Sequence, residues 1–164
     1  MRIIAGTHRG KKLIEYFNPQ TRPTTDRVKE NVFNLLQNHL DLHGARVLDL
    51  FAGTGAYGIE CLSRGAGFVH FNDHDPQAVQ VIKKNLGQIW SNCQVTQKDY
   101  LAVLAQANYD LFFLDPPYAS DLGEQAINQI EHGLIVFETD HEFTDPNIFL
   151  ARRYGRVHLY FLKK

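Results

Sequence analysis

The chain has 164 residues, of which 44% are hydrophobic and 21% charged, a composition that fits one globular domain around a single core. Its apolar runs are far shorter than the ~20 residues that cross a bilayer, and its two cysteines cannot build a disulfide framework. Because the N-terminus also lacks an apolar leader, we expect a cytoplasmic protein with no membrane partner. We also expect the protein to be a monomer.

The net charge of -1 hides an uneven distribution. Residues 1–30 carry a net charge of +4, residues 151–164 carry +5, and the segment between them carries -10. Basic segments on either side of an acidic middle favour a phosphate-binding surface beside a pocket for a cation, because Lys and Arg displace counterions from phosphates. Charge alone leaves open the alternative of two solvated chain ends.

The predicted elements begin with an N-terminal extension, residues 1–20, in which Arg2–Gly6 and Lys12–Phe17 are expected to pair as a β-hairpin. Within residues 21–44 we expect a helix that begins beside a capping Thr or Asp and ends near Gly44. Apolar residues recur there at helical spacing. This helix leads into the core of a single domain.

Residues 45–164 alternate short apolar strands with amphipathic helices. Such alternation favours a mostly parallel sheet with helices on both faces, which is an α/β, doubly wound, Rossmann-like fold. The last two strands flank Tyr154-Gly155 and are expected to form an antiparallel hairpin at the edge of the sheet. The expected strands are 45–51, 68–71, 93–96, 110–114, 134–137, 149–153 and 157–162, and the expected helices include 60–64, 78–86, 100–107 and 125–130.

A glycine-rich loop follows the first core strand. The run from Asp49 to Gly58 contains G-x-G-x-x-G, and Asp73 lies twenty residues after Gly53. The same pattern fits a nicotinamide dinucleotide site, so an NAD-binding oxidoreductase is one alternative, and glycines that only make a tight turn are another. Asp49 favours a cationic ligand such as S-adenosylmethionine, because its carboxylate would repel a pyrophosphate.

Acidic residues follow successive core strands: Asp49, Asp73 with Asp75, Asp99 and Asp115. The carboxyl ends of parallel strands line one crevice, so we expect these side chains to converge. Asp73 suits ribose hydroxyls and Asp99 suits an adenine amino group, so the series describes an adenosine attached to a positive group. Each acid taken alone could instead cap a helix.

The most specific motif is Asp115-Pro116-Pro117-Tyr118, which follows a strongly apolar strand. The prolines stiffen this turn, because each fixes its own φ angle and donates no backbone hydrogen bond. The Asp115 carboxylate and the Pro116 carbonyl can hold the protons of a base amine, which aims the nitrogen lone pair at an incoming methyl group. Tyr118 offers a flat face for stacking on the base. The motif predicts methyl transfer to a base amine. The alternative is a rigid surface turn with a packed tyrosine.

Cysteine and metal chemistry are not expected. Cys61 lies on a predicted helix and Cys93 at a strand start, so both are expected to be buried thiols rather than nucleophiles. The histidines are scattered, and one pair at four-residue spacing, His70 with His74, straddles a strand end. No metal site is therefore predicted.

Segments spread over nearly the whole chain resemble one known family, the bacterial methyltransferases that modify the exocyclic N2 amine of guanine in 16S ribosomal RNA. The glycine loop and the Asp-Pro-Pro-Tyr turn are shared with DNA adenine methyltransferases, so the N-terminal pieces discriminate between the two. The matching segments are Met1–Gly6 with Arg9-Gly10, Thr21–Arg27, Val47–Gly53, Leu62–Gly65, Phe113–Tyr118 and Arg153–Gly155.

The resemblance implies a class I methyltransferase fold, S-adenosyl-L-methionine as cofactor, and small-subunit ribosomal RNA within an assembling 30S particle as partner. Two departures stand out: Asp73 replaces the family's usual glutamate, and the segment 119–132 is short. By resemblance the cofactor-binding residues are Asp49, Phe51, Gly53, Gly55, Asp73 and Asp99. The catalytic residues are Asp115, Pro116 and Tyr118. The RNA-binding residues are Arg2, Arg9, Lys11, Lys12, Arg22 and Arg27.

Three alternatives to a ribosomal RNA guanine methyltransferase stay open at this point. A DNA adenine-N6 methyltransferase usually brings an added target-recognition region, for which 164 residues leave little room. The NAD-dependent oxidoreductase would share the glycine pattern but not the preference for a cation. A catalytically inactive RNA-binding protein of the same fold would not depend on Asp115.

Overall fold

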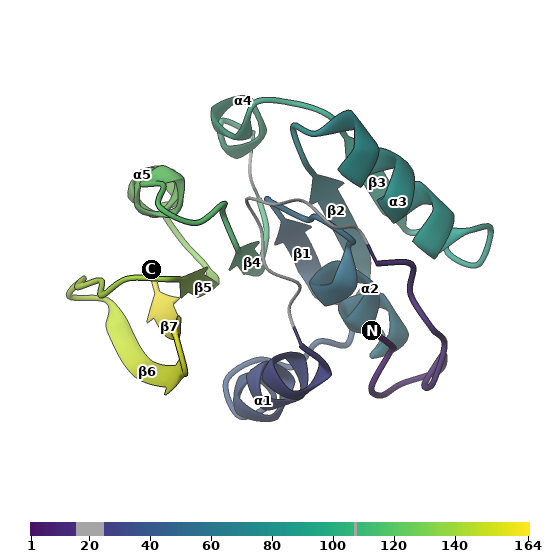
Figure 1. Ribbon diagram of the computed structural model, residues 1–164, viewed down its shortest axis with the longest axis horizontal. Coiled ribbons are helices and arrows are strands. Elements are labelled where there is room, and N and C mark those ends of the chain that lie inside the picture. The colour runs from purple at the N-terminus through teal and green to yellow at the C-terminus, as the bar shows by residue number, and fades with distance from the viewer. Residues whose placement is uncertain (16–24, 107) are drawn as a thin grey trace.

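The computed structural model describes residues 1–15, 25–106 and 108–164. Figure 1 shows a central sheet with helices packed around it. The helices are α1 (Asp26–Leu36), α2 (Ala56–Ser63), α3 (Pro76–Leu86), α4 (Tyr100–Leu104) and α5 (Leu122–Gln129). The strands are β1 (Arg46–Asp49), β2 (Phe68–Asn72), β3 (Cys93–Thr96), β4 (Leu111–Leu114), β5 (Leu134–Thr139), β6 (Ile148–Tyr154) and β7 (Val157–Lys163).

The strands form one sheet in the order β3-β2-β1-β4-β5-β7-β6, which confirms the predicted doubly wound α/β fold with its C-terminal hairpin. Neighbours from β3 through β5 are parallel, whereas β7 runs antiparallel to both β5 and β6. The chain builds outward from β1 to β3 and then crosses to β4. The strand order therefore switches between β1 and β4, and in open parallel sheets ligands bind at the carboxyl ends of strands beside such a switch.

The sheet separates two apolar layers. Buried side chains of α1, α2 and α3 pack on one face, and those of α4 and α5 pack on the other. Gly58 sets how closely α2 approaches the strands, because a Cβ atom there would lie 2.2 Å from the Phe71 ring. In a close-packed interior, a larger residue at this position would have to displace the ring.

The N-terminal extension differs from the predicted hairpin. Arg2 and Lys12 form a single antiparallel bridge instead of two paired strands, and the end of the second predicted strand lies outside the described residues. The reason is a long-range contact with α2. The N–H groups of Ile4 and Ala5 donate to the Glu60 carboxylate of α2, at 2.8 and 3.0 Å, rather than to a neighbouring strand.

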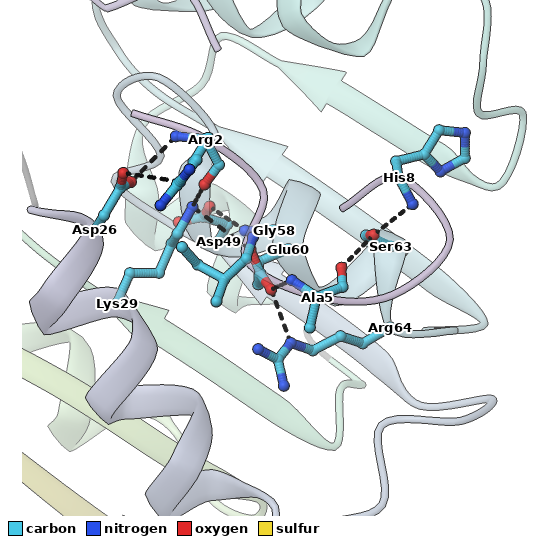
Figure 2. A network of polar contacts seen from close by, with 11 residues as sticks. Arg2, Ala5, His8, Asp26, Lys29, Asp49, Gly58, Glu60, Ser63 and Arg64 are labelled. Atoms are coloured by element: carbon cyan, nitrogen blue, oxygen red, sulfur yellow. Dashed lines mark hydrogen bonds and ion pairs between the residues drawn. The ribbon is translucent and has the colours of Figure 1, made fainter. Parts of the chain in front are cut away.

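Glu60 joins this extension to two helices, as Figure 2 shows. Its carboxylate lies 3.5 Å from the Lys29 Nζ of α1 and 2.9 Å from the Arg64 Nε at the end of α2. Glu60 and Lys29 are fully buried, and Lys29 also donates to the Arg2 carbonyl at 2.6 Å. Ser63 adds hydrogen bonds to the same segment. Lys29, one of the basic residues of the N-terminus, therefore belongs to the interior and not to a charged surface.

Two predicted helices are shorter than expected. α1 ends at Leu36 rather than near Gly44, because the N–H groups of Asn38 and His39 bond to carbonyls three positions back and tighten the last turn. The helix expected over 100–107 ends at Leu104. Within the described ranges, no helix is long and apolar enough to cross a membrane.

Candidate active site

The Asp-Pro-Pro-Tyr turn leaves the middle of the sheet, where β4 ends. Pro116 is buried and both Asp115 and Tyr118 are partly buried, so the turn lies against the protein rather than projecting from it. Ala119 follows with a left-handed backbone, φ 55°, and its N–H donates to the Asp140 carboxylate at 3.5 Å. A residue other than glycine stores strain in this conformation, and such strain is typical of functional loops.

The glycine loop between β1 and α2 is held by carboxylates. Gly53 donates its N–H to Asp73 and Gly58 donates its N–H to Asp49, both at 2.9 Å. The N–H of Gly55 closes a turn within the loop at 2.7 Å. A pyrophosphate would have to accept hydrogen bonds from these N–H groups, two of which already donate to carboxylates. The negative charges of the two carboxylates would also repel it. The geometry opposes NAD and favours a positively charged ligand.

Burial perturbs the acids of this loop. Desolvation raises the pKa of Asp49 to about 7, although the Gly58 N–H that it accepts lowers the value. The nearby Asp73 carboxylate raises the Asp49 pKa further, and burial also raises the pKa of Asp73. A cation beside these acids would favour their ionised forms, so this region of the protein has an electrostatic preference for positive charge.

The predicted series of strand-end acids lies along the carboxyl edge of the parallel strands. Asp73 follows β2, and its second oxygen accepts the Asp75 N–H at 2.9 Å. Asp75 and Asp99 cap helices, because their carboxylates accept the N–H groups of Gln77 in α3 and Leu101 in α4. The capping alternative therefore describes these two acids in the structure, and a cofactor contact of Asp99 stays a prediction.

Phe51 is the remaining predicted cofactor residue. It is partly buried, and its ring centroid lies 5.7 Å from that of Tyr100, the first residue of α4. Asp99 directly precedes Tyr100 and is exposed. An apolar ring and a carboxylate close to one another suit an adenine, which has a flat face and an amino group.

The predicted RNA-binding residues are not equivalent. Lys11 is partly buried: its Nζ donates to the Asn85 carbonyl at 3.0 Å and lies 5.0 Å from the centroid of the Trp90 ring. Arg22 lies outside the described residues. Those with exposed side chains are Arg2, Arg9, Lys12 and Arg27. Three of these cations, Arg2, Arg9 and Lys12, lie on the extension that is fastened to the core, and the fourth, Arg27, lies in α1. The Arg2 guanidinium lies 3.8 Å from the Asp26 carboxylate.

The sequence reasoning missed a buried pair behind the turn. Tyr57 of α2 stacks on Phe113 of β4, with ring centroids 4.8 Å apart, and its hydroxyl donates to Glu138 at 2.9 Å. Glu138 lies next to Asp115 in register, since the last residues paired across β4 and β5 directly precede these acids. Burial raises the pKa of Glu138 to about 7, and the Tyr57 hydroxyl lowers it. Glu138 follows an apolar run as Asp115 does, so the rule for strand-end acids would have found it.

A second missed cluster surrounds His141, just after β5. The His141 ring lies 2.6 Å from the Glu124 carboxylate of α5 and 3.1 Å from the Asp140 carboxylate. The hydrogen bond with Glu124 and then that with Asp140 raise the pKa of His141. Because Asp140 also accepts the Ala119 N–H, the cluster ties α5 to the backbone that follows the Asp-Pro-Pro-Tyr turn.

The chain matches, over residues 1–163, the family described as Conserved hypothetical protein 95. It is 38% identical to ribosomal RNA small subunit methyltransferase D of Haemophilus influenzae, across 87% of this chain and 80% of that protein. It is 40% identical to the protein of the same name from Escherichia coli K12, across 80% of this chain and 67% of that protein.

Solved structures agree on the fold. One described as "Putative methyltransferase yhhF from Escherichia coli" gives a TM-score of 0.84 at 31% identity, covering 100% of this chain and 97% of that chain. A more distant 16S rRNA N2 methyltransferase from T. thermophilus, solved with AdoMet and guanosine, gives 0.66 at 20% identity, covering 86% and 44%. The chain therefore belongs to the Conserved hypothetical protein 95 family of methyltransferases and has the class I methyltransferase fold.

Proposed function

We propose that this methyltransferase transfers the methyl group of S-adenosyl-L-methionine to the exocyclic N2 amino group of a guanine in 16S ribosomal RNA. The proposal rests on one juxtaposition: the turn from Asp115 to Tyr118 follows β4, and the glycine loop follows its parallel neighbour β1. Carboxylates that suit a cation would thus lie beside an acceptor-rich turn at the strand switch. The names of the relatives support ribosomal RNA as the substrate class.

The loop and the strand-end acids would hold the cofactor. S-adenosyl-L-methionine has a sulfonium and an amino group, and the carboxylates of Asp49 and Asp73 suit that positive charge. Phe51 and Asp99 would contact the adenine, and the glycines, Gly53 and Gly55, would let the ligand approach the backbone. When bound, the cofactor supplies an electrophilic methyl group.

The target guanine would lie against the turn. The Asp115 carboxylate and the Pro116 carbonyl would accept hydrogen bonds from the N2 amine, while Tyr118 stacks on the base. This arrangement favours a pyramidal nitrogen whose lone pair faces the methyl group, and positioning supplies most of the catalysis. The nitrogen would take the methyl carbon from the sulfonium, whose carbon–sulfur bond would break to leave a neutral thioether, and the Asp115 carboxylate would accept the proton that the nitrogen loses.

The RNA backbone would contact the N-terminal extension and the start of α1. We infer that the substrate is presented by an assembling 30S particle, and that the protein works as a monomer in the cytoplasm. Proteins that recognise RNA sequence-specifically favour single-stranded bases that are splayed out of the stack, and a turn at the surface can bind such a base. The proposed phosphate contacts are Arg2, Arg9, Lys11, Lys12, Arg22 and Arg27.

Nucleoside mass spectrometry of small-subunit RNA tests the proposal. Cells without this protein should lack one N2-methylguanosine, and the wild-type chain should restore it. An Asp115→Asn variant with unchanged thermal unfolding should not restore it. Unchanged N2-methylguanosine in the deleted strain would rule out the proposed substrate, and full restoration by Asp115→Asn would indicate an RNA-binding role without catalysis.

The same cells and the purified protein separate the remaining alternatives. A fall in N6-methyladenine of DNA, with RNA unaffected, would favour the DNA methyltransferase. Calorimetric titration should detect binding of S-adenosyl-L-methionine and none of NAD. Tight NAD binding without binding of S-adenosyl-L-methionine would favour the oxidoreductase instead.

A further inference from the structure

The tip of the C-terminal hairpin lies on the same edge of the sheet as the Asp-Pro-Pro-Tyr turn. β7 runs antiparallel to β5 and pairs His158 with Thr139, the last residue of β5. The tip between β6 and β7 therefore lies at the carboxyl edge of the parallel strands, where β4 also delivers its turn. The other end of β7 pairs Lys163 with Leu134 and lies at the opposite edge. Figure 1 shows the hairpin beside β5.

The tip is strongly basic. Residues 151–164 contain five Lys and Arg and no acid, and Arg152, Arg153 and Arg156 are all exposed at or near the turn. The hydrogen bonds of Arg152 and Arg153 go to backbone carbonyls of the hairpin itself. Within the described part of the chain, none of the three forms an ion pair with a carboxylate.

The segment between β5 and β6 contains three acids, and two of them have partners other than the arginines. Asp140 contacts His141 and the Ala119 N–H, and Asp145 accepts hydrogen bonds from Asn147. The third, Glu142, is exposed and forms no ion pair with the tip within the described residues. The guanidinium groups at the tip therefore present most of their donors to solvent. Each has five N–H donors in a fork that matches phosphate oxygens.

The distance between tip and turn suits one substrate strand. The order β4-β5-β7-β6 puts three inter-strand steps between the turn and β6, which is roughly 14 Å at ~4.8 Å per step. A single-stranded RNA whose target base enters the turn would carry its neighbouring phosphates over this interval. The N-terminal cations, by contrast, lie on or beside a segment that is fastened to α1 and α2, and Figure 1 shows this segment on the other side of β4 from the hairpin.

We propose that Arg153 and Arg156, with Arg152, bind phosphates of the substrate RNA a few nucleotides from the target guanine. This inference rests on the proposed function, which it deepens by adding a second contact surface. The cations read no base, so they contribute affinity and register rather than sequence choice. The RNA strand would then be held on both sides of the catalytic turn.

The test compares two double variants of equal charge change. Arg153→Gln/Arg156→Gln removes charge at the tip, and Lys163→Gln/Lys164→Gln removes it at the opposite end of the same hairpin. The substrate is the small-subunit particle, or its purified 16S RNA, from cells that lack this protein. Binding is measured across a salt series, and methyl transfer is followed with saturating cofactor.

Between low and moderate salt, the tip variant should bind RNA about ten-fold more weakly than the wild type. Each of the two lost phosphate contacts should weaken binding by roughly three-fold. The slope of log affinity against log salt should fall in magnitude by about 1.4, since a single strand contributes ~0.7 per phosphate. KM should rise with kcat and cofactor affinity unchanged. The control variant should match the wild type in both slope and KM.

Two results would overturn the inference without touching the proposed function. One is a tip variant whose RNA affinity and salt slope equal those of the wild type while the wild type methylates the RNA. The other is an equal loss in tip and control variants, which would indicate a diffuse charge effect or an unfolded hairpin. Failure of the wild type itself to methylate the RNA would refute the proposed function instead.

Discussion

Buried carboxylates in two regions of the molecule differ in how many hydrogen-bond donors surround them. The carboxylate beneath the N-terminal extension has several donors, whereas two carboxylates at the carboxyl edge of the sheet have few. Glu60 contacts the ammonium of Lys29, the guanidinium of Arg64 and two backbone N–H groups. Among the described residues, Asp49 accepts one backbone N–H and Glu138 accepts one hydroxyl. Desolvation raises the pKa of both Asp49 and Glu138 to about 7.

The difference separates a structural role from a functional one. A buried charge that is fully paired holds chain segments together, and removing a partner is costly. A buried carboxylate with few donors destabilises the unliganded protein above its ordinary pKa, but it gains from a cation that enters the pocket. The first kind of site fastens the extension to the core, and Asp49, a site of the second kind, belongs to the cofactor site that we propose.

The largest expected effect breaks the fastened region. Glu60→Ala leaves the Lys29 ammonium buried without its carboxylate and deprives two N–H groups of their acceptor. We expect a loss of about 3–5 kcal/mol in the free energy of unfolding, measured in urea. Glu30→Ala, which removes an exposed glutamate from the neighbouring helix, should change stability by less than ~0.5 kcal/mol. Similar losses in both variants would contradict the assigned role of Glu60.

The next effect tests the poorly paired region. Tyr57→Phe removes the hydroxyl that lowers the pKa of Glu138, so this pKa should rise above its present value of about 7. A buried acid with a raised pKa destabilises the fold as pH rises, because the acid must then ionise without water around it. The loss should therefore be larger near pH 8, about 1.5–3 kcal/mol, than near pH 6, where it is about 1 kcal/mol. A loss that does not depend on pH would show that the Glu138 contact is unimportant.

Cofactor binding should report the charge of Asp49. If a cation needs the ionised carboxylate, affinity rises as pH increases through the Asp49 pKa of about 7. S-adenosyl-L-methionine should bind about ten-fold more tightly near pH 8 than near pH 6 by calorimetry. Asp49→Asn should flatten the profile, and 5′-methylthioadenosine, which has no cationic group, should show no such rise. A pH dependence that survives in Asp49→Asn would assign the titration elsewhere.

The smallest effect concerns His141, whose partly exposed ring is an intermediate case. Its carboxylate partners raise its pKa, so the stability it contributes is present below its ordinary pKa and is lost as pH rises through the raised value. His141→Gln should lower the free energy of unfolding by about 0.2–1 kcal/mol near pH 6 and by less near pH 8.5. His39→Gln serves as the control, because the His39 ring forms no ion pair within the described ranges. The reverse pH order would mean that the ring binds as the neutral form.

Local sequence patterns were enough to predict the succession of strands and helices along the chain, the glycine loop, the Asp-Pro-Pro-Tyr turn and the acids that follow the strands. These features depend on local periodicity and on residues that force turns, so they can be read without knowing what packs against what. The sequence also indicated the C-terminal hairpin from two apolar strands around Tyr154-Gly155. The exact ends of the elements could not be predicted from these patterns. The end of α1, for example, depends on how its last turn tightens.

The roles of the charged residues, in contrast, depend on the tertiary structure. Lys29 and Arg153 look alike in the sequence, yet one is buried against Glu60 and the other is exposed at the tip of the hairpin. The pairing of Tyr57 with Glu138 joins residues 81 positions apart. The physical reason is that burial, register and long-range hydrogen bonds set the energy of a charge, and none of these is a property of neighbouring residues in the chain.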